Sequence, residues 1–136
     1  MKDKVVIITG ASQGLGKELS VQLAKLGAKI ALVARNEKLL SEVKKIINEE
    51  GGVAEYFVCD VTDVEAINST VSKIIDTFKT VDVLINNAGI WTNDKLEENN
   101  NKLVEKTFMV NSVAPINFYK AVSPFLKKIK MVILCL

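Results

Sequence analysis

The sequence predicts an α/β domain in which a parallel sheet carries helices on both faces. Apolar runs of strand length alternate along the chain with segments whose apolar residues recur at helical spacing. Strands that alternate with helices form parallel sheets, because each helix returns the chain to the start of the next strand. A glycine-rich turn, residues 9–16, joins the first strand to the first helix. We expect one domain over residues 1–136, a length that can bury a real core.

The first strand and helix flank the glycine-rich turn. Residues 5–8 are all Val or Ile and have the length of a buried strand. Residues 17–26 have leucines at helical spacing, and Gly27 suits the end of that helix. A second strand is predicted at residues 29–34, and Asn36 suits the N-cap of the next helix.

The later elements continue the alternation. A third strand is predicted at residues 53–59, and a third helix begins at Asp63. Residues 81–85 form the fourth strand, and the polar residues 91–101 are interpreted as a surface loop or short helix. Residues 102–128 are predicted to be mostly helical, with interruptions at two prolines.

The last apolar run, residues 131–136, is predicted as a fifth strand, after which the fold is truncated. Right-handed crossovers give this pattern a Rossmann-type, doubly wound parallel sheet with strand order 3-2-1-4-5. Ligands of such sheets bind across the carboxyl ends of the strands, beside the first strand. Residues that directly follow the strands are therefore the candidate site residues.

Composition and charge argue against several partners. Hydrophobic residues make up 49% of the chain, charged residues 25%, and the net charge is +2. This balance gives no electrostatic case for nucleic acid or a membrane surface. The chain has no histidine, and Cys59 and Cys135 lie in apolar runs without metal or redox spacing. We predict free buried thiols, no metal site and a cytoplasmic location, since nothing has the pattern of a signal peptide or membrane span.

The glycine-rich turn has the features of a phosphate-binding site. Glycines let the chain turn tightly and let a pyrophosphate approach the backbone, while the N–H groups that begin the helix attract an anion. The spacing is Gly-x-x-x-Gly-x-Gly, which differs from the Gly-x-Gly-x-x-Gly of the common dinucleotide fingerprint. A glycine cluster in an ordinary turn is the alternative interpretation.

Arg35 follows the second strand, where dinucleotide folds meet the adenosine ribose. A carboxylate at this place favours NAD, whereas an arginine accommodates the 2′-phosphate of NADP through its planar fork of donors. The sequence therefore favours NADP(H), with NAD(H) as the alternative. A surface arginine without a ligand is the other interpretation.

Two further strand ends carry polar or small residues. Asp60 follows the third strand, where its carboxylate would accept from an adenine amino group; a turn or capping aspartate is the alternative. Asn86-Asn87-Ala88-Gly89 ends the fourth strand, and its small residues would let a cofactor approach the backbone. An ordinary Asn-Gly-type turn is the alternative.

These motifs, in this order, resemble the short-chain dehydrogenase/reductase family of the classical type. The family's glycine motif falls on residues 9–16, its adenine-ring aspartate on Asp60 and its Asn-Asn-Ala-Gly motif on residues 86–89. Its helix asparagine, a supporting member of the catalytic tetrad, falls on Asn111. The resemblance implies a set of cofactor-binding residues: Thr9, Gly10, Ser12, Gln13, Gly14, Leu15, Gly16, Arg35, Asp60, Val61, Asn87, Ala88, Gly89 and Val110.

The resemblance implies an NADP(H)-dependent oxidoreductase that transfers hydride between a nicotinamide and a small carbonyl or alcohol. Asn111 resembles the asparagine that bends its helix and helps to hold a water in a proton relay. Relatives commonly dimerise through this helix, so a homo-oligomer is expected.

The sequence departs from the family in its catalytic residues. The family uses a serine after the fifth strand and a Tyr-x-x-x-Lys pair, the tyrosine acting as general acid and base. Here Tyr56 is followed four positions later by Asp60, and Tyr119 by Ser123. We therefore interpret the chain as a cofactor-binding half that is inactive by itself. A non-catalytic dinucleotide-binding module or regulatory remnant is the alternative; a methyltransferase explains neither Arg35 nor residues 86–89.

Overall fold

The structure, a computed structural model, describes the backbone of residues 1–91 and 101–134 and the side chains of residues 1–91 and 101–126. The predicted loop over residues 91–101 lies almost wholly outside the described residues, and Cys135 lies outside them. The elements in chain order are β1 (Val5–Thr9), α1 (Gly14–Lys25), β2 (Lys29–Ala34), α2 (Glu37–Glu49), β3 (Val53–Val58), α3 (Val64–Phe78), β4 (Val81–Asn86), α4 (Asn101–Phe108), the π-helix η2 (Met109–Val113), α5 (Ala114–Val122), the 3₁₀-helix η3 (Ser123–Phe125) and β5 (Leu126–Leu134).

The sheet is parallel throughout its described pairs, and β1 lies at its centre. The order β3-β2-β1-β4 confirms the 3-2-1-4 part of the predicted order. The backbone of β5 lies on the far side of β4, with a shift of register between Val81 and Val83. A parallel sheet of this order places the carboxyl ends of β1, β2, β3 and β4 along one edge.

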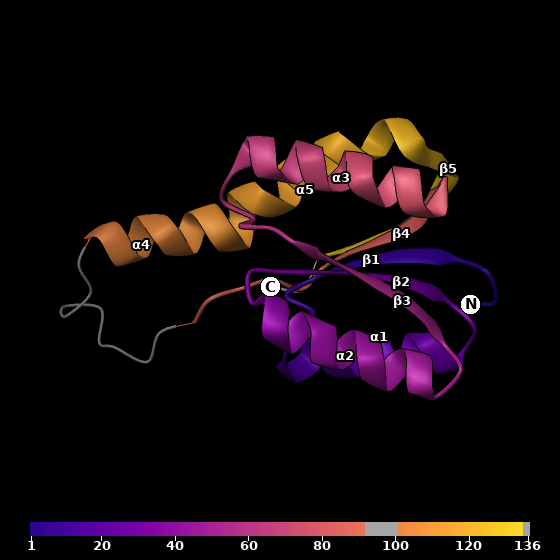
Figure 1. Cartoon of the computed structure of the whole chain (residues 1–136). Coiled ribbons are helices and arrows are strands. Elements are labelled where there is room, and N and C mark those ends of the chain that lie inside the picture. Colours follow the sequence, from indigo (N-terminus) through magenta and orange to yellow (C-terminus); the bar gives the residue numbers. More distant parts are fainter. Residues whose placement is uncertain (92–100, 135–136) are drawn as a thin grey trace.

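The two layers of helices follow from the alternation of side chains along each strand. In β1, Ile7 packs with α3 and α5, while Val6 and Ile8 pack with α1 and α2. Figure 1 shows these pairs of helices on opposite faces of the sheet. Because both faces are covered, all five residues of β1 are buried, and the strand is apolar throughout except for its last residue, Thr9.

Sequence signals located most helix ends. Asn36 Oδ1 accepts from the N–H of Leu39 at the start of α2, and Asp63 Oδ1 accepts from two N–H groups at the start of α3, as predicted. The predicted helix over residues 102–128 was too long, because the helical region ends at Phe125. Pro124 has no N–H for the carbonyl of Lys120, which instead accepts from the hydroxyl of Ser123 at 3.1 Å.

Helix α4 differs from the other α-helices of the described chain. It has no buried residue, and Figure 1 shows it extending away from the sheet. Cys59 is free and buried, as predicted. Among the described residues, no helix has the length and apolar character needed to cross a membrane.

Candidate functional site

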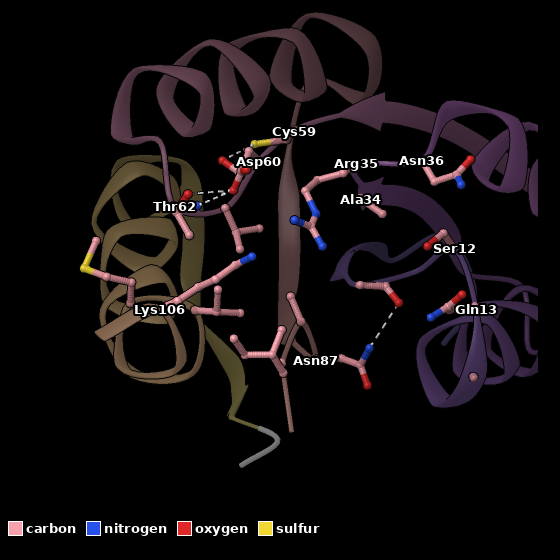
Figure 2. Close-up of a pocket in the computed structure, with 18 of the residues that line it drawn as sticks. Ser12, Gln13, Ala34, Arg35, Asn36, Cys59, Asp60, Thr62, Asn87 and Lys106 are labelled. Atoms are coloured by element: carbon pink, nitrogen blue, oxygen red, sulfur yellow. Dashed lines mark hydrogen bonds between the residues drawn. The ribbon is translucent and has the colours of Figure 1, made fainter. Parts of the chain in front are cut away.

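An open cleft of about 1330 Å³ lies across the carboxyl ends of β1, β2, β3 and β4. All of the predicted cofactor-binding residues except Thr9 and Gly16 line this cleft, and Asn111 does not. Figure 2 shows several of these side chains around one open space. The predicted residues on the cleft wall are Gly10, Ser12, Gln13, Gly14, Leu15, Arg35, Asp60, Val61, Asn87, Ala88, Gly89 and Val110.

Helix α1 begins at this cleft without a side-chain cap. Its N-cap residue, Gln13, makes no capping hydrogen bond, and the first turn contains no acidic residue. Helices α2 and α3, by contrast, are capped by Asn36 and Asp63. The N–H groups at the start of α1 therefore have no side-chain acceptor. Together with the positive end of the helix dipole, they can bind an anion in the cleft.

Thr9 lies behind the cleft wall and joins the two strands that build it. The N–H groups of Asn87 and Ala88 both donate to Thr9 Oγ1 at 3.0 Å. In return, Asn87 Nδ2 donates to the carbonyls of Thr9 at 3.0 Å and Gly10 at 3.3 Å. Thr9 is only 2% exposed, so its hydroxyl positions the end of β4 against the glycine-rich turn.

Two glycines of the turn are required by close packing. Gly10 has φ +66°, and a Cβ there would lie 2.9 Å from Ala88 Cα. A Cβ on Gly16 would lie 2.3 Å from the carbonyl oxygen of Gly10 and 2.4 Å from Asn87 Nδ2. Gly16 therefore lets α1 pack against the turn that its own chain makes, which explains why it does not line the cleft.

Arg35 and Asp60 stand at the ends of neighbouring strands, β2 and β3, and both are exposed. Asp60 Oδ1 accepts from the N–H of Thr62 at 2.9 Å and from its hydroxyl at 2.8 Å. These two hydrogen bonds are the main reason that the pKa of Asp60 is lowered, with smaller contributions from the positive charges of Arg35 and Lys106. Asp60 therefore has the role of a turn aspartate, which the sequence offered as an alternative, and its Oδ1 already accepts from Thr62.

Asn111 holds the segment that follows β4 rather than facing the cleft. Its Oδ1 accepts from the N–H of Ile90 at 2.9 Å, and its Nδ2 donates to the carbonyl of Ile90 at 3.0 Å. The residue belongs to η2, where the N–H of Ala114 reaches back to the carbonyl of Met109. Pro115 follows and has no N–H, so the wide turn and the proline together account for the irregular helix.

One wall of the cleft, supplied by α4 and η2, was not predicted from the sequence. Lys102, Glu105, Lys106 and Met109 line it together with the predicted Val110. Lys102, Lys106 and Val110 recur at a spacing of four, which places them on one helix face. The spacing of four could be read from the sequence and groups these residues on one face. The sequence does not show that this face lies toward the cleft.

Comparison with known proteins agrees with this architecture. The family model described as short chain dehydrogenase matches residues 4–133. The chain belongs to the short-chain dehydrogenase family. Its parallel sheet of order 3-2-1-4 with flanking helices is a Rossmann-like α/β fold.

Three short-chain relatives illustrate the range of the match. A fatty acyl-CoA reductase of Acinetobacter baylyi is 36% identical over 132 residues, which are 96% of this chain and 45% of the relative. The 15-hydroxyprostaglandin dehydrogenase [NAD(+)] of Bos taurus is 37% identical, over 84% of this chain and 41% of the relative. The crystal structure of a metagenomic short-chain oxidoreductase in complex with NADP superposes with a TM-score of 0.85 at 32% identity, over 91% of this chain and 57% of the other. The chain thus spans about half the length of the curated relatives it matches.

Proposed function

We propose that residues 1–136 form a single dinucleotide-binding domain of an NADP(H)-dependent short-chain oxidoreductase. The uncapped start of α1, opening on a cleft at the carboxyl ends of the strands, is the observation that carries the proposal. In this proposal the sheet order of the whole protein begins 3-2-1-4-5, and the substrate is a small carbonyl or alcohol compound.

The proposed roles follow from the charged and hydrogen-bonding groups that each residue does not already use within the protein. The N–H groups of Gly14 and Leu15, at the uncapped start of α1, hold the diphosphate, and Arg35 pairs with the 2′-phosphate. Asp60 uses Oδ1 for Thr62, so we assign its Oδ2 to the adenine amino group. When bound, the nicotinamide supplies a hydride to a carbonyl carbon or takes one from an alcohol.

Asn111 is a positioning residue in this proposal. Both polar atoms of its side chain are engaged by the backbone of Ile90, so the side chain holds the segment after Gly89 in place. This segment borders the cleft, since Gly89 and Ile90 both line it. Any proton transfer in the reaction therefore needs a group other than the Asn111 side chain.

Arg35→Ala is expected to weaken NADP(H) binding by roughly 10- to 100-fold and to leave NAD(H) binding nearly unchanged. A charge-assisted contact with a phosphate contributes about 1.5–3 kcal/mol, and only NADP(H) carries a phosphate at the ribose 2′ position. Calorimetric titration of the chain with NADP⁺ and NAD⁺ measures both affinities. Arg35→Lys keeps the charge without the fork and should lie between the two.

The cofactor assignment is wrong if the unaltered chain binds NAD⁺ as tightly as NADP⁺, or more tightly. Equal losses for both cofactors in Arg35→Ala would also contradict it, because the arginine would then act on a part that they share.

A second candidate function is a dinucleotide-binding module without catalysis. Within these 136 residues neither tyrosine has a lysine four positions later, so the two candidates differ in whether the whole protein contains a Tyr-x-x-x-Lys pair. Both candidates require the same cleft, so cofactor binding does not separate them. Only turnover by residues 1–136 themselves would decide between the candidates, because it would exclude the module without catalysis.

We also propose that two copies associate through the helical segment that contains Asn111. Its exposed apolar side chains include Phe108, 64% exposed, and Ile116, 55% exposed, and such a row is typical of a protein interface. Ile116→Glu is expected to raise the dimer dissociation constant at least about tenfold, since burying a large apolar side chain contributes about 1.5–3 kcal/mol. Sedimentation velocity measures the change. Leu26→Glu, at an exposed apolar residue next to α1, is the control, and a monomeric unaltered chain would contradict the proposal.

A further inference from the structure

Helix α4 brings two lysines to the cleft, Lys102 and Lys106, and Lys106 points toward the space that Arg35 enters. Lys106 and Arg35 both line the cleft, one from α4 and the other from the end of β2. Figure 2 shows the ammonium group of Lys106 and the guanidinium group of Arg35 directed into the same open space. Two elements far apart in the sequence therefore place positive charge on facing walls.

The carboxylate of Asp60 interacts with the charges of both cations but forms a close ion pair with neither. The charges of Arg35 and Lys106 each contribute to lowering the pKa of Asp60, so both act on this carboxylate through space. The hydrogen-bond partner of Asp60 Oδ1 is nevertheless Thr62. Within the described residues, none of the ion pairs shorter than 4.0 Å involves Arg35 or Lys106, which leaves both cations to a ligand.

We propose that Lys106 is a second specificity-determining residue for the 2′-phosphate of NADP(H), acting across the cleft from Arg35. The inference rests on the proposed function. Lys106 lies on α4, outside both the glycine motif and the end of β2. Arginine offers a planar fork to two phosphate oxygens, whereas the lysine ammonium is a compact charge on a flexible stem. The two cations can therefore meet one phosphate from different sides without competing for the same oxygen atoms.

The expected effect is modest because Lys106 is exposed, so that solvent screens its charge. Lys106→Met keeps most of the aliphatic stem and removes the charge. We expect it to weaken NADP⁺ binding about three- to fivefold and to leave NAD⁺ binding unchanged, as for other exposed charge pairs. Lys106→Arg should retain the NADP⁺ affinity. The difference between Lys106→Met and the unaltered chain should shrink as the salt concentration rises.

Calorimetric titration of the 136-residue chain with NADP⁺ and NAD⁺, at low and at high salt, measures these effects. Lys120→Met on α5 is the matched control, because Lys120 is also exposed but does not line the cleft. Circular dichroism establishes that each variant keeps the same fold. A selective loss of NADP⁺ affinity in Lys106→Met, absent in Lys120→Met, supports the inference.

Two outcomes overturn the inference while leaving the proposed function intact. In the first, Arg35→Ala weakens NADP⁺ binding and Lys106→Met does not. In the second, Lys106→Met weakens NADP⁺ and NAD⁺ equally, which would place the lysine on a part of the cofactor common to both. An unaltered chain that binds neither dinucleotide overturns the proposed function itself, and the inference with it.

Discussion

Residues 1–136 by themselves are expected to bind NADPH without oxidising it in the presence of aldehydes or ketones. Reduction of a carbonyl needs a group that donates a proton to the developing alkoxide. The family resemblance assigns this role to the tyrosine of a Tyr-x-x-x-Lys pair, and neither Tyr56 nor Tyr119 has a lysine at that spacing. Asn111 is engaged with the backbone of Ile90 and offers no proton to a substrate. Removing the members of such a catalytic unit leaves little beyond binding effects.

The measurement is the loss of NADPH absorbance with a panel of small aldehydes and ketones. Gly14→Trp is the control, because no atom lies within 4 Å of a Cβ built there and an indole would fill part of the cleft. The φ of +54° at Gly14 disfavours any side chain, so circular dichroism must first show that this variant is folded. We expect the unaltered chain and Gly14→Trp to give the same background rate. Turnover that Gly14→Trp abolishes would show that residues 1–136 contain a proton donor other than a Tyr-x-x-x-Lys tyrosine, and would exclude the non-catalytic module.

Gly16→Ala is expected to destabilise the domain by about 2 kcal/mol, despite the higher helix propensity of alanine. The new methyl group would lie 2.3 Å from the carbonyl oxygen of Gly10, a backbone atom that moves only with the whole turn. Overpacking of this kind costs roughly 1–3 kcal/mol or more, while alanine returns at most about 1 kcal/mol to the helix. The displaced turn would also disturb Asn87, whose Nδ2 lies 2.4 Å from the same Cβ position.

Urea unfolding followed by circular dichroism measures this loss. Circular dichroism is preferable to fluorescence, because the single tryptophan, Trp91, is already 88% exposed in the folded state. Gly89→Ala is the matched control, since its nearest neighbour, Asn111 Oδ1, lies at an ordinary contact distance of 3.6 Å. Equal stability of Gly16→Ala and Gly89→Ala would contradict the packing argument.

Much of the fold could be predicted because buried parallel strands have a simple pattern. Strands covered on both faces are apolar runs, and β1, β2 and β4 were located from such runs. The caps at Asn36 and Asp63 are local, since each side chain binds an N–H two or three residues away. The end of the last helical segment was placed too late, because Pro124 was interpreted as an interruption within the helix, whereas it lies in the 3₁₀ turn that ends the helical region.

The candidate site was predicted in part. Strand ends and the glycine motif pointed to most residues of the cleft wall, because ligands of such sheets bind at the carboxyl edge. The role of Asn111 in holding Ile90 was not foreseen, since its partner lies 21 positions away. Lys106 was not predicted, because the order of elements along the chain does not specify which face of α4 lies toward the cleft.

The sequence by itself determined the alternation of strands and helices, the glycine turn and the arginine after the second strand. These features depend on local pattern and on the rules that order parallel strands. Only the tertiary structure decided that Thr9 is a connector between β1 and β4, 78 positions from its partner Asn87. Only the tertiary structure placed Lys106 opposite Arg35. Both results depend on which elements become neighbours in space, and burial of the core on the two faces of the sheet settles that, whereas the local pattern around each residue does not.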